Sequence, residues 1–198
     1  MVLASRNPGK LKEIQAILSS LPVRLLSLED FPDMPEISED GSTFAENAGQ
    51  KARTVARLTG RVAIADDSGL TVDALQGRPG VYSSRYAGDQ ATDEDRYQKL
   101  LKEMEGIPEG KRQGAFVCAI AVASPDGDAD IVEAKWRGTI MFSPRGTNGF
   151  GYDPVFFIPE LNQTVAELAP TLKNKISHRA QAFEKLKRVL PKYLSPQP

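Results

Sequence analysis

The run from Gly114 to Ala123 constrains the fold most, because it is apolar on both faces of an extended strand. Such a strand must be covered on both sides, which predicts a central strand of a sheet. Val62–Ala65 is a second apolar run with β-branched residues, and it predicts another buried strand. At 198 residues the chain can bury a substantial core around them. Further strands are predicted at Met1–Ala4, after the turn Pro125-Asp126-Gly127 as far as Trp136, at Thr139–Phe142 and at Val155–Ile158.

Apolar residues at helical spacing lie between these strands. Thr43 and Glu46 have the spacing of a capping box, and Gly60 is a helix stop. A helix is therefore predicted from this capping box to about Thr59. The segment from Gly77 to Gly88 is too rich in glycine and proline for a regular element. The other predicted helices follow Lys10, follow Thr92 and run from Lys173 to a stop at Pro191.

Composition and charge exclude several classes of protein. Lysine and arginine total 25 and aspartate and glutamate total 26, so no net charge favours stable nucleic-acid binding. One cysteine and one histidine exclude a disulfide framework and a zinc site, so a metal would be held by oxygen. No apolar stretch has the length of a membrane span, and Met1 begins directly on a predicted strand. We therefore expect a cytoplasmic enzyme or binding domain with no membrane partner.

Two adjacent carboxylates, Asp66 and Asp67, follow the strand Val62–Ala65 and precede Ser68 and Gly69. We expect the strand to end at these carboxylates. Side chains alternate across a strand, so the two should point to opposite sides, one bracing the turn and one facing a ligand. An Asx-turn that merely ends the strand is the alternative, and this short motif alone favours it.

Two other stretches have a ligand-binding pattern. Ser5–Lys10 is a polar turn between a strand and a helix, and a helix N-terminus with a lysine favours phosphate, although a plain turn with a solvated lysine fits equally well. It lacks the spacing of a Walker A loop. Gly146–Pro154 places two aromatic residues among three glycines, where a ring could stack on a base; an ordinary hairpin is the alternative. Asn47 and Lys51 share one helix face, which either lines a cleft or is solvated.

Six motifs in order resemble one family. They are S-R-N-P-G-K-L-K-E from Ser5, T-F-A-E-N-A from Thr43 followed by Lys51, A-D-D-S-G-L from Ala65, R-P-G-V-Y-S-S-R-Y-A-G from Arg78, G-F-G-Y-D-P-V-F from Gly149, and S-H-R-A-Q-A from Ser177. Together they cover essentially the whole chain and resemble the inosine/xanthosine triphosphate pyrophosphatases, which remove deaminated purine nucleotides. Arg6, where glycine is common, and Ser84, where alanine is frequent, are small departures.

The resemblance implies a role for each matching residue. Asp67 would be the general base and would hold Mg²⁺ together with Glu39, although Glu36 and Asp40 are neighbouring candidates for that second ligand. The alternation of side chains along the strand, in turn, makes Asp66 a bracing residue and not a ligand. The implied substrate contacts are Ser5, Arg6, Asn7, Pro8, Gly9, Lys10, Lys51, Ser68, Phe150, Gly151, Tyr152, Asp153, Lys173, His178 and Arg179.

The resemblance also implies the fold and the reaction. The fold would be a single α/β domain over residues 1–198, with an elongated mixed twisted sheet flanked by helices and two lobes around a central cleft. The enzyme would be an Mg²⁺-dependent, homodimeric pyrophosphatase that converts ITP, dITP and XTP to the monophosphate and pyrophosphate. Three rivals fit less well. The pair His178-Arg179 argues against a Maf-like pyrophosphatase, the D-D-S-G motif is not that of a haloacid-dehalogenase-type phosphatase, and the charge balance gives no sign of an RNA-binding module.

Overall fold

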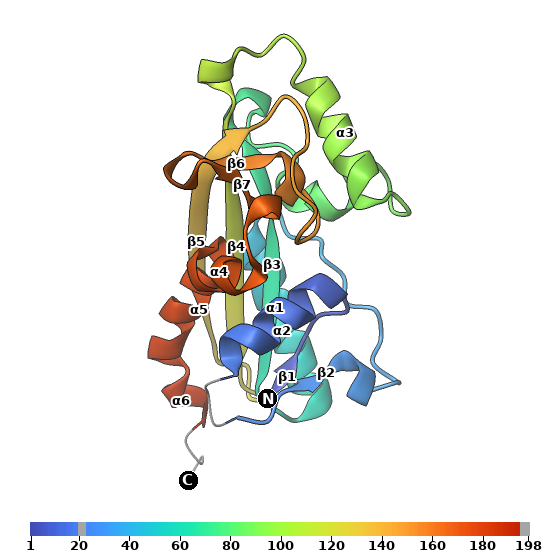
Figure 1. The fold of residues 1–198 in the computed structure, drawn as a ribbon. Helices are drawn as coiled ribbons and strands as arrows, with labels where there is room; N and C mark the ends of the chain where they lie inside the picture. The colour runs from blue at the N-terminus through green and yellow to red at the C-terminus, as the bar shows by residue number, and fades with distance from the viewer. Residues whose placement is uncertain (20–22, 195–198) are drawn as a thin grey trace. The chain divides into compact units, whose positions relative to one another are not determined.

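The strands form one mixed sheet in the computed structural model, which describes residues 1–19 and 23–194 (Figure 1). Within these residues the sheet has seven strands in the order β2-β1-β3-β4-β5-β6-β7. β1 is parallel to β2 and β3, whereas β6 is antiparallel to β5 and β7. The α/β class with a mixed sheet is therefore confirmed. The strands are β1 Val2–Leu3, β2 Leu26–Ser27, β3 Ala63–Val72, β4 Gln113–Ala123, β5 Ala129–Ile140, β6 Phe156–Ile158 and β7 Gln163–Thr164.

The chain divides into two compact units, and β3, β4 and β5 contribute to both. The first unit consists of residues 1–67, 118–134 and 179–198, and the second of residues 68–117 and 135–178. The helices are α1 Pro8–Leu18, α2 Phe44–Thr59, α3 Asp93–Glu103, α4 Pro170–Ile176, α5 His178–Val189 and α6 Pro191–Leu194.

Each unit has its own hydrophobic core. In the first unit, α1 contributes Ile14 and α5 contributes Phe183 to a cluster with strand residues such as Ile64 and Ile120. In the second unit, Leu100 of α3 packs in a cluster with Phe116 and Phe156. Burial of side chains of this size is worth about 1.5–3 kcal/mol each, so these clusters hold the strands that carry the polar residues described below.

The helix starts follow the sequence signals. Thr43 caps α2 by accepting the amide N–H of Glu46 at 3.1 Å, and Gly60 ends the helix as predicted. Thr92 caps α3, with Asp95 completing a capping box.

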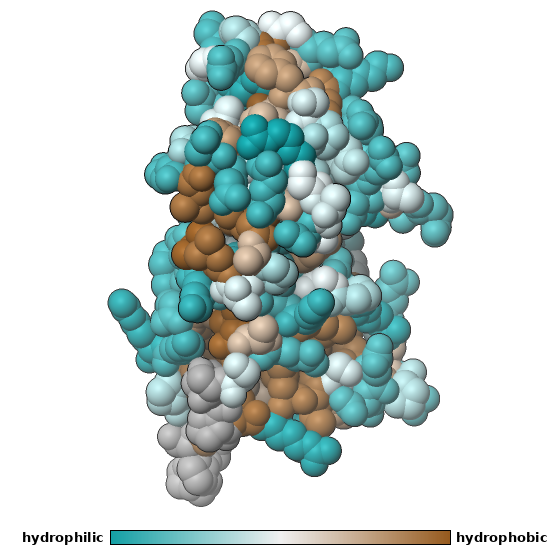
Figure 2. Space-filling model, viewed as in Figure 1, coloured by the Kyte–Doolittle hydropathy of each residue, from teal (hydrophilic) through white to brown (hydrophobic). Residues whose placement is uncertain are grey.

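On the face drawn in Figure 2, hydrophilic surface predominates and hydrophobic patches are scattered within it. Among residues 1–19 and 23–194, no helix combines the length and apolar character of a membrane span.

The prediction that a strand ends at Asp66 is wrong, because β3 continues to Val72. Both carboxylates have partners, so they can be buried within the strand. Gly69 also belongs to it: a Cβ at this position would lie 2.3 Å from Oγ of Ser83, and glycine allows the helical turn around Ser83 to approach the strand.

Three other boundaries differ from the prediction. Thr139 continues β5 and does not open a separate strand. Gly80–Arg85, predicted as irregular, forms a 3₁₀-helix. The predicted last helix is interrupted at Ser177, whose extended backbone separates α4 from α5, and Pro191 begins α6. Proline fits the first turn of a helix because its missing N–H would have no helical partner there.

Candidate functional site

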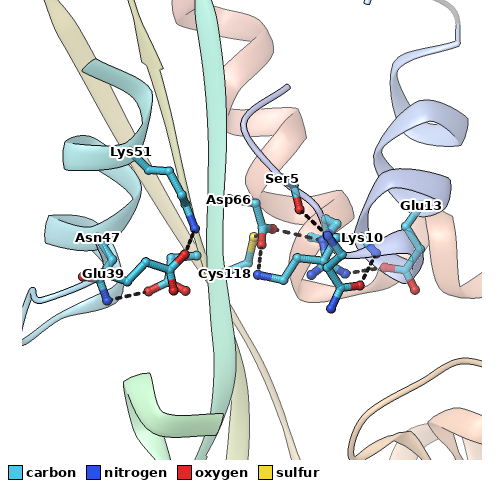
Figure 3. A network of polar contacts seen from close by, with 11 residues as sticks. Ser5, Lys10, Glu13, Glu39, Asn47, Lys51, Asp66 and Cys118 are labelled. Atoms are coloured by element: carbon cyan, nitrogen blue, oxygen red, sulfur yellow. Dashed lines mark hydrogen bonds and ion pairs between the residues drawn. The ribbon is translucent and has the colours of Figure 1, made fainter. Parts of the chain in front are cut away.

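The predicted site residues fall into both units. The first unit holds Ser5, Arg6, Asn7, Pro8, Gly9, Lys10, Glu39, Lys51, Asp67 and Arg179, and the second holds Ser68, Phe150, Gly151, Tyr152, Asp153, Lys173 and His178. Asp66 and Asp67 follow one another on β3 and bond to different partners, as the alternation of strand side chains predicts. Figure 3 shows Lys10 and Glu13 on one side of β3 and Asn47 and Lys51 on the other.

Asp66 is fully buried and braces the first unit. Nζ of Lys10 lies 2.5 Å from its Oδ1, while Nε of Arg179 donates to its Oδ2 at 3.0 Å. The Sγ–H of Cys118 also donates to Oδ2, at 3.1 Å. Burial opposes the charge of the carboxylate, but the positive charges of Arg179 and Lys10 outweigh it and hold the pKa of Asp66 well below its usual value. Asp66 is therefore ionised and committed to partners within the protein.

Arg179, one of the predicted substrate contacts, is enclosed by carboxylates of the protein. Its side chain is 2% exposed, and its guanidinium pairs with both Asp66 and Glu13. Burial would lower the pKa of Arg179, but the two carboxylates raise it. The charge of Arg179 is thus balanced inside the first unit, where the residue holds Asp66, and its contact with the substrate stays a prediction. The sequence motif places the residue but does not reveal these long-range partners.

The Ser5–Lys10 turn forms the start of α1. Oδ1 of Asn7 accepts the amide N–H of Lys10 at 3.0 Å, and Oγ of Ser5 accepts that of Asn7 at 3.3 Å. Burial alone would lower the pKa of Lys10, but the charges of Asp66 and Asp67 raise it, so the ammonium is charged. A charged lysine at a helix N-terminus can attract phosphate oxygens. The side chain of Arg6 instead donates to the carbonyl oxygen of Met34 at 3.1 Å.

Asp67 is held by a residue that the site prediction omitted. Nδ2 of Asn47 donates to Oδ2 of Asp67 at 2.9 Å, and the amide N–H of Gly41 donates to Oδ1 of Asn47 at 2.7 Å. The second bond fixes which end of the Asn47 amide faces the carboxylate. Burial raises the pKa of Asp67, and the nearby charges of Lys10 and Lys51 only partly offset this effect. A carboxylate with a raised pKa is a better proton acceptor near neutral pH than an ordinary one.

Lys51 pairs with Glu39 on the same side of β3, as Figure 3 shows. Lys51 and Asn47 are both buried, so the shared face of α2 is turned inward and is not solvated. Among the candidate acids of the loop, Glu39 is half-buried while Glu36 and Asp40 are exposed. Within residues 1–19 and 23–194, no three His, Cys, Asp or Glu side chains are grouped to hold a metal ion. Glu39 and Asp67 are the two carboxylates that the prediction assigns to a metal.

In the second unit, the loop Gly149–Asp153 is folded around Asp153. This buried carboxylate lies 2.5 Å from Nζ of Lys173 and accepts the amide N–H of Phe150 at 3.0 Å. The ammonium of Lys173 also lies 4.7 Å from the centre of the Phe150 ring. Of the two aromatic residues of this loop, Phe150 is half-buried and Tyr152 is buried. The hydroxyl of Tyr152 donates to the carbonyl oxygen of Ser83 at 2.9 Å. Only Phe150 remains a candidate for stacking.

His178 lies at the start of α5, and its ring stacks on that of Phe116 with 4.9 Å between the centroids. Ser68, the residue after Asp67 on β3, is half-buried. Sequence reasoning gave no role to Asn47, although it noted that Asn47 shares a helix face with Lys51. It also missed Asp93, whose Oδ2 accepts the amide N–H of Gly151 at 2.7 Å. No local pattern could reveal that contact, because the two residues are 58 positions apart.

Comparison with known proteins gives consistent matches over nearly the whole chain. The model of the Ham1 family matches residues 1–189. The dITP/XTP pyrophosphatase of Geobacter sulfurreducens is 56% identical over 187 residues, which are 94% of each chain. That of Geobacillus kaustophilus is 53% identical over 94% of this chain and 91% of its own. A HAM1 protein from Coxiella burnetii has a solved structure with a TM-score of 0.88 and 48% identity, covering 96% of this chain and 98% of that one.

Proposed function

The chain belongs to the Ham1 family, and we propose that it is a nucleoside triphosphate pyrophosphatase. It hydrolyses deaminated purine nucleotides, namely ITP, dITP and XTP, to the monophosphate and pyrophosphate. The similarity to dITP/XTP pyrophosphatases over 94% of the chain is the observation that carries this proposal. Removing such nucleotides would protect the nucleotide pool, and we place the enzyme in the cytoplasm as a homodimer, an assembly that light scattering on the purified protein can test.

Asp67 is the proposed general base. Its Oδ2 accepts from Asn47, which leaves Oδ1 to accept a proton from the attacking water. General-base catalysis of this kind contributes about 10²–10⁴-fold to a rate. The reaction needs little further covalent help, because phosphoryl transfer depends chiefly on positioning and on neutralising charge.

Positive side chains of the first unit neutralise the phosphates in this proposal. Lys10 stands at the N-terminus of α1, and Lys51 stands on the Asp67 side of β3. Each ammonium is paired with a carboxylate, Asp66 and Glu39 respectively, so each is held in place before a phosphate arrives. The backbone N–H groups of Arg6 and Gly9 and the hydroxyl of Ser5 are the further donors that this turn offers to the same oxygens in our proposal.

The residues around Asp67 fit Mg²⁺, which prefers oxygen ligands and typically takes one or two carboxylates plus substrate phosphates. Glu39 and Asp67 supply the carboxylates in our proposal. The burial of Asp67, which the nearby positive charges of Lys10 and Lys51 only partly compensate, supports this assignment. When bound, Mg²⁺ would neutralise phosphate charge beside Asp67.

We assign the base contacts to the second unit. The half-buried ring of Phe150 is the stacking surface, and Lys173 and Asp153 hold the loop that carries it. Stacking tolerates every base, so selectivity for the 6-oxygen of hypoxanthine and xanthine must come from hydrogen-bond donors. The imidazole of His178 is the proposed donor, and Ser68 is a further proposed substrate contact.

Quantification of products from ITP tests the proposal. We expect one pyrophosphate and one IMP per turnover with Mg²⁺, little turnover in EDTA, and recovery when Mg²⁺ is restored. XTP should behave as ITP does, and ATP should be hydrolysed far more slowly. Release of orthophosphate in place of pyrophosphate would contradict the proposed reaction, and full turnover in EDTA would contradict the metal assignment. The Asp67→Asn variant is the matched control for a contaminating phosphatase.

A further inference from the structure

The loop that carries Phe150 is held from outside as well as from within. Inside the loop, Asp153 accepts the amide N–H of Phe150 at 3.0 Å. The next amide, that of Gly151, donates to Oδ2 of Asp93 at 2.7 Å. Asp93 is the first residue of α3 and is remote in sequence, so its carboxylate joins the loop to a helix. Two successive backbone N–H groups thus each donate to a different carboxylate.

The Gly151 bond fixes a backbone that would otherwise be hard to hold. Gly151 has φ = 64°, in the left-handed region, and no atom outside its immediate neighbours lies within 4 Å of where its Cβ would be. Side-chain packing therefore cannot hold Gly151 in place. The backbone N–H of Gly151 donates to Asp93, and this hydrogen bond fixes the backbone at Gly151.

Asp93 is itself held in place. Its Oδ1 accepts from Nη1 of Arg96 at 2.6 Å, one turn further along α3, so each carboxylate oxygen has a separate donor. A carboxylate at the first turn of a helix is also favoured by the helix dipole. A hydrogen bond to a charged acceptor is stronger than one to a neutral oxygen. These features make the position of Asp93, and through it the position of Gly151, well defined.

We propose that Asp93 is a positioning residue for nucleotide binding, which acts by fixing Gly151 and thereby the ring of Phe150. The part of this proposal that concerns the base rests on the proposed function. Asp93 need not touch the nucleotide. Loss of its carboxylate frees the Gly151 amide and lets the ring adopt several positions, so the enzyme must order the loop each time a base binds.

Asp95 provides a matched control. It lies on the same turn of α3, but its carboxylate accepts from the amide and hydroxyl of Thr92 and closes the capping box. Asp95→Ala therefore weakens the start of α3 without removing the bond to Gly151. Asp93→Asn keeps an oxygen that can accept from Gly151 while removing the charge, and it serves as the conservative variant.

Hydrogen exchange is the first measurement. We expect Asp93→Ala to increase the rate of amide exchange in the segment 149–153 by about tenfold or more. The free energy of a hydrogen bond to a charged group corresponds to a change in the opening equilibrium of that size. Asp95→Ala should leave this segment unchanged, and Asp93→Asn should fall between Asp93→Ala and the wild type. Unchanged exchange in Asp93→Ala, or equal exchange in Asp93→Ala and Asp95→Ala, would overturn the proposal. Should Asp93→Ala not fold, Asp93→Asn against the wild type decides: wild-type exchange would overturn the proposal and faster exchange would support it.

Kinetics provide the second measurement. We expect Asp93→Ala to raise KM for ITP about tenfold with a much smaller change in kcat, while the inhibition constant of inorganic tripolyphosphate, which has no base, stays at the wild-type value. Equal losses for ITP and tripolyphosphate would show a general defect and overturn the positioning role. If the wild-type enzyme itself does not hydrolyse ITP, the proposed function fails, whereas the exchange experiment still tests whether Asp93 orders the loop.

Discussion

Asp66 and Asp67 are consecutive residues of β3, yet their surroundings shift the pKa values of the two carboxyl groups in opposite directions. Burial opposes ionisation of both. Arg179 and Lys10 overcome this effect for Asp66 and lower its pKa, whereas the charges near Asp67 do not, and its pKa is raised. The strand thus places a structural anion beside the proposed general base, and stability measurements can separate the two.

Asp67→Asn should greatly lower activity without lowering stability. The variant keeps an oxygen for Asn47 but removes the proposed base, so we expect kcat to fall by at least about 10²-fold. Because the folded state raises the pKa of Asp67, ionisation of this group above its unfolded pKa, near 3.8, destabilises the wild type. The melting temperature of the variant relative to the wild type should therefore rise as the pH increases from below 3.8 towards neutrality. Near wild-type turnover in the folded variant would exclude Asp67 as the base.

Asp66→Asn should have the reverse effect on stability. It leaves Lys10 and Arg179 without their shared countercharge, and breaking a buried ion pair costs about 3–5 kcal/mol. The pKa of Asp66 is lowered in the folded state, so its stabilising contribution is present above the unfolded pKa and is lost as the pH falls through the folded one. Chemical denaturation at several pH values should show a deficit that shrinks only in strong acid. A deficit below about 1 kcal/mol at neutral pH would contradict the bracing role.

Asn47→Ala should change the pH dependence of catalysis. Asn47 donates a hydrogen bond to the ionised carboxylate of Asp67, which favours the charged form. Its removal should raise the pKa of Asp67 further, because hydrogen bonds to a charged form stabilise that form. The acid limb of the kcat/KM profile for ITP should therefore move to higher pH than in the wild type. An acid limb at the wild-type position would indicate that another group controls it, and Thr43→Ala, which removes only the helix cap, is the control.

Phe150→Ala should weaken the binding of all nucleotides to a similar extent. Stacking of a base on an aromatic ring is worth about 1–3 kcal/mol and is insensitive to base identity. We therefore expect kcat/KM to fall about five- to a hundredfold for ITP, XTP, GTP and ATP, with the ratios among them preserved. Steady-state kinetics on the four substrates tests this expectation. A change confined to ITP and XTP would mean that Phe150 reads the base and does not merely support it.

Local patterns predicted much of the fold because they reflect local physics. The capping signals at Thr43 and Thr92 and the apolar run of β4 all correspond to real elements, since helix ends and buried strands depend on nearby residues. The continuation of β3 beyond Asp66 could not be predicted in this way. A polar pair normally ends a buried strand, and it continues here because Arg179, 113 positions away, neutralises Asp66.

The same distinction applies to the candidate site. The resemblance predicted Asp67, Lys51 and Glu39 as site residues; in the structure Lys51 pairs with Glu39, and burial raises the pKa of Asp67. The partners that set their properties were less visible. Asn47 was seen only as a helix-face neighbour of Lys51, and Asp93 was not seen at all, because its bond to Gly151 depends on tertiary packing.

The discontinuous chain path of the first unit has a consequence for biosynthesis. Its core includes Ile14 and Ile64 from early in the chain and Phe183 from near its end. Asp66 likewise obtains one of its two cationic partners, Arg179, only from the last segment. On the ribosome, where residues emerge at roughly 5–20 per second, the early strands must wait for Arg179 before their buried carboxylate has both of its cationic partners. During translation the nascent first unit therefore lacks its closing helix, and this interval is when it is most exposed to chaperones and proteases.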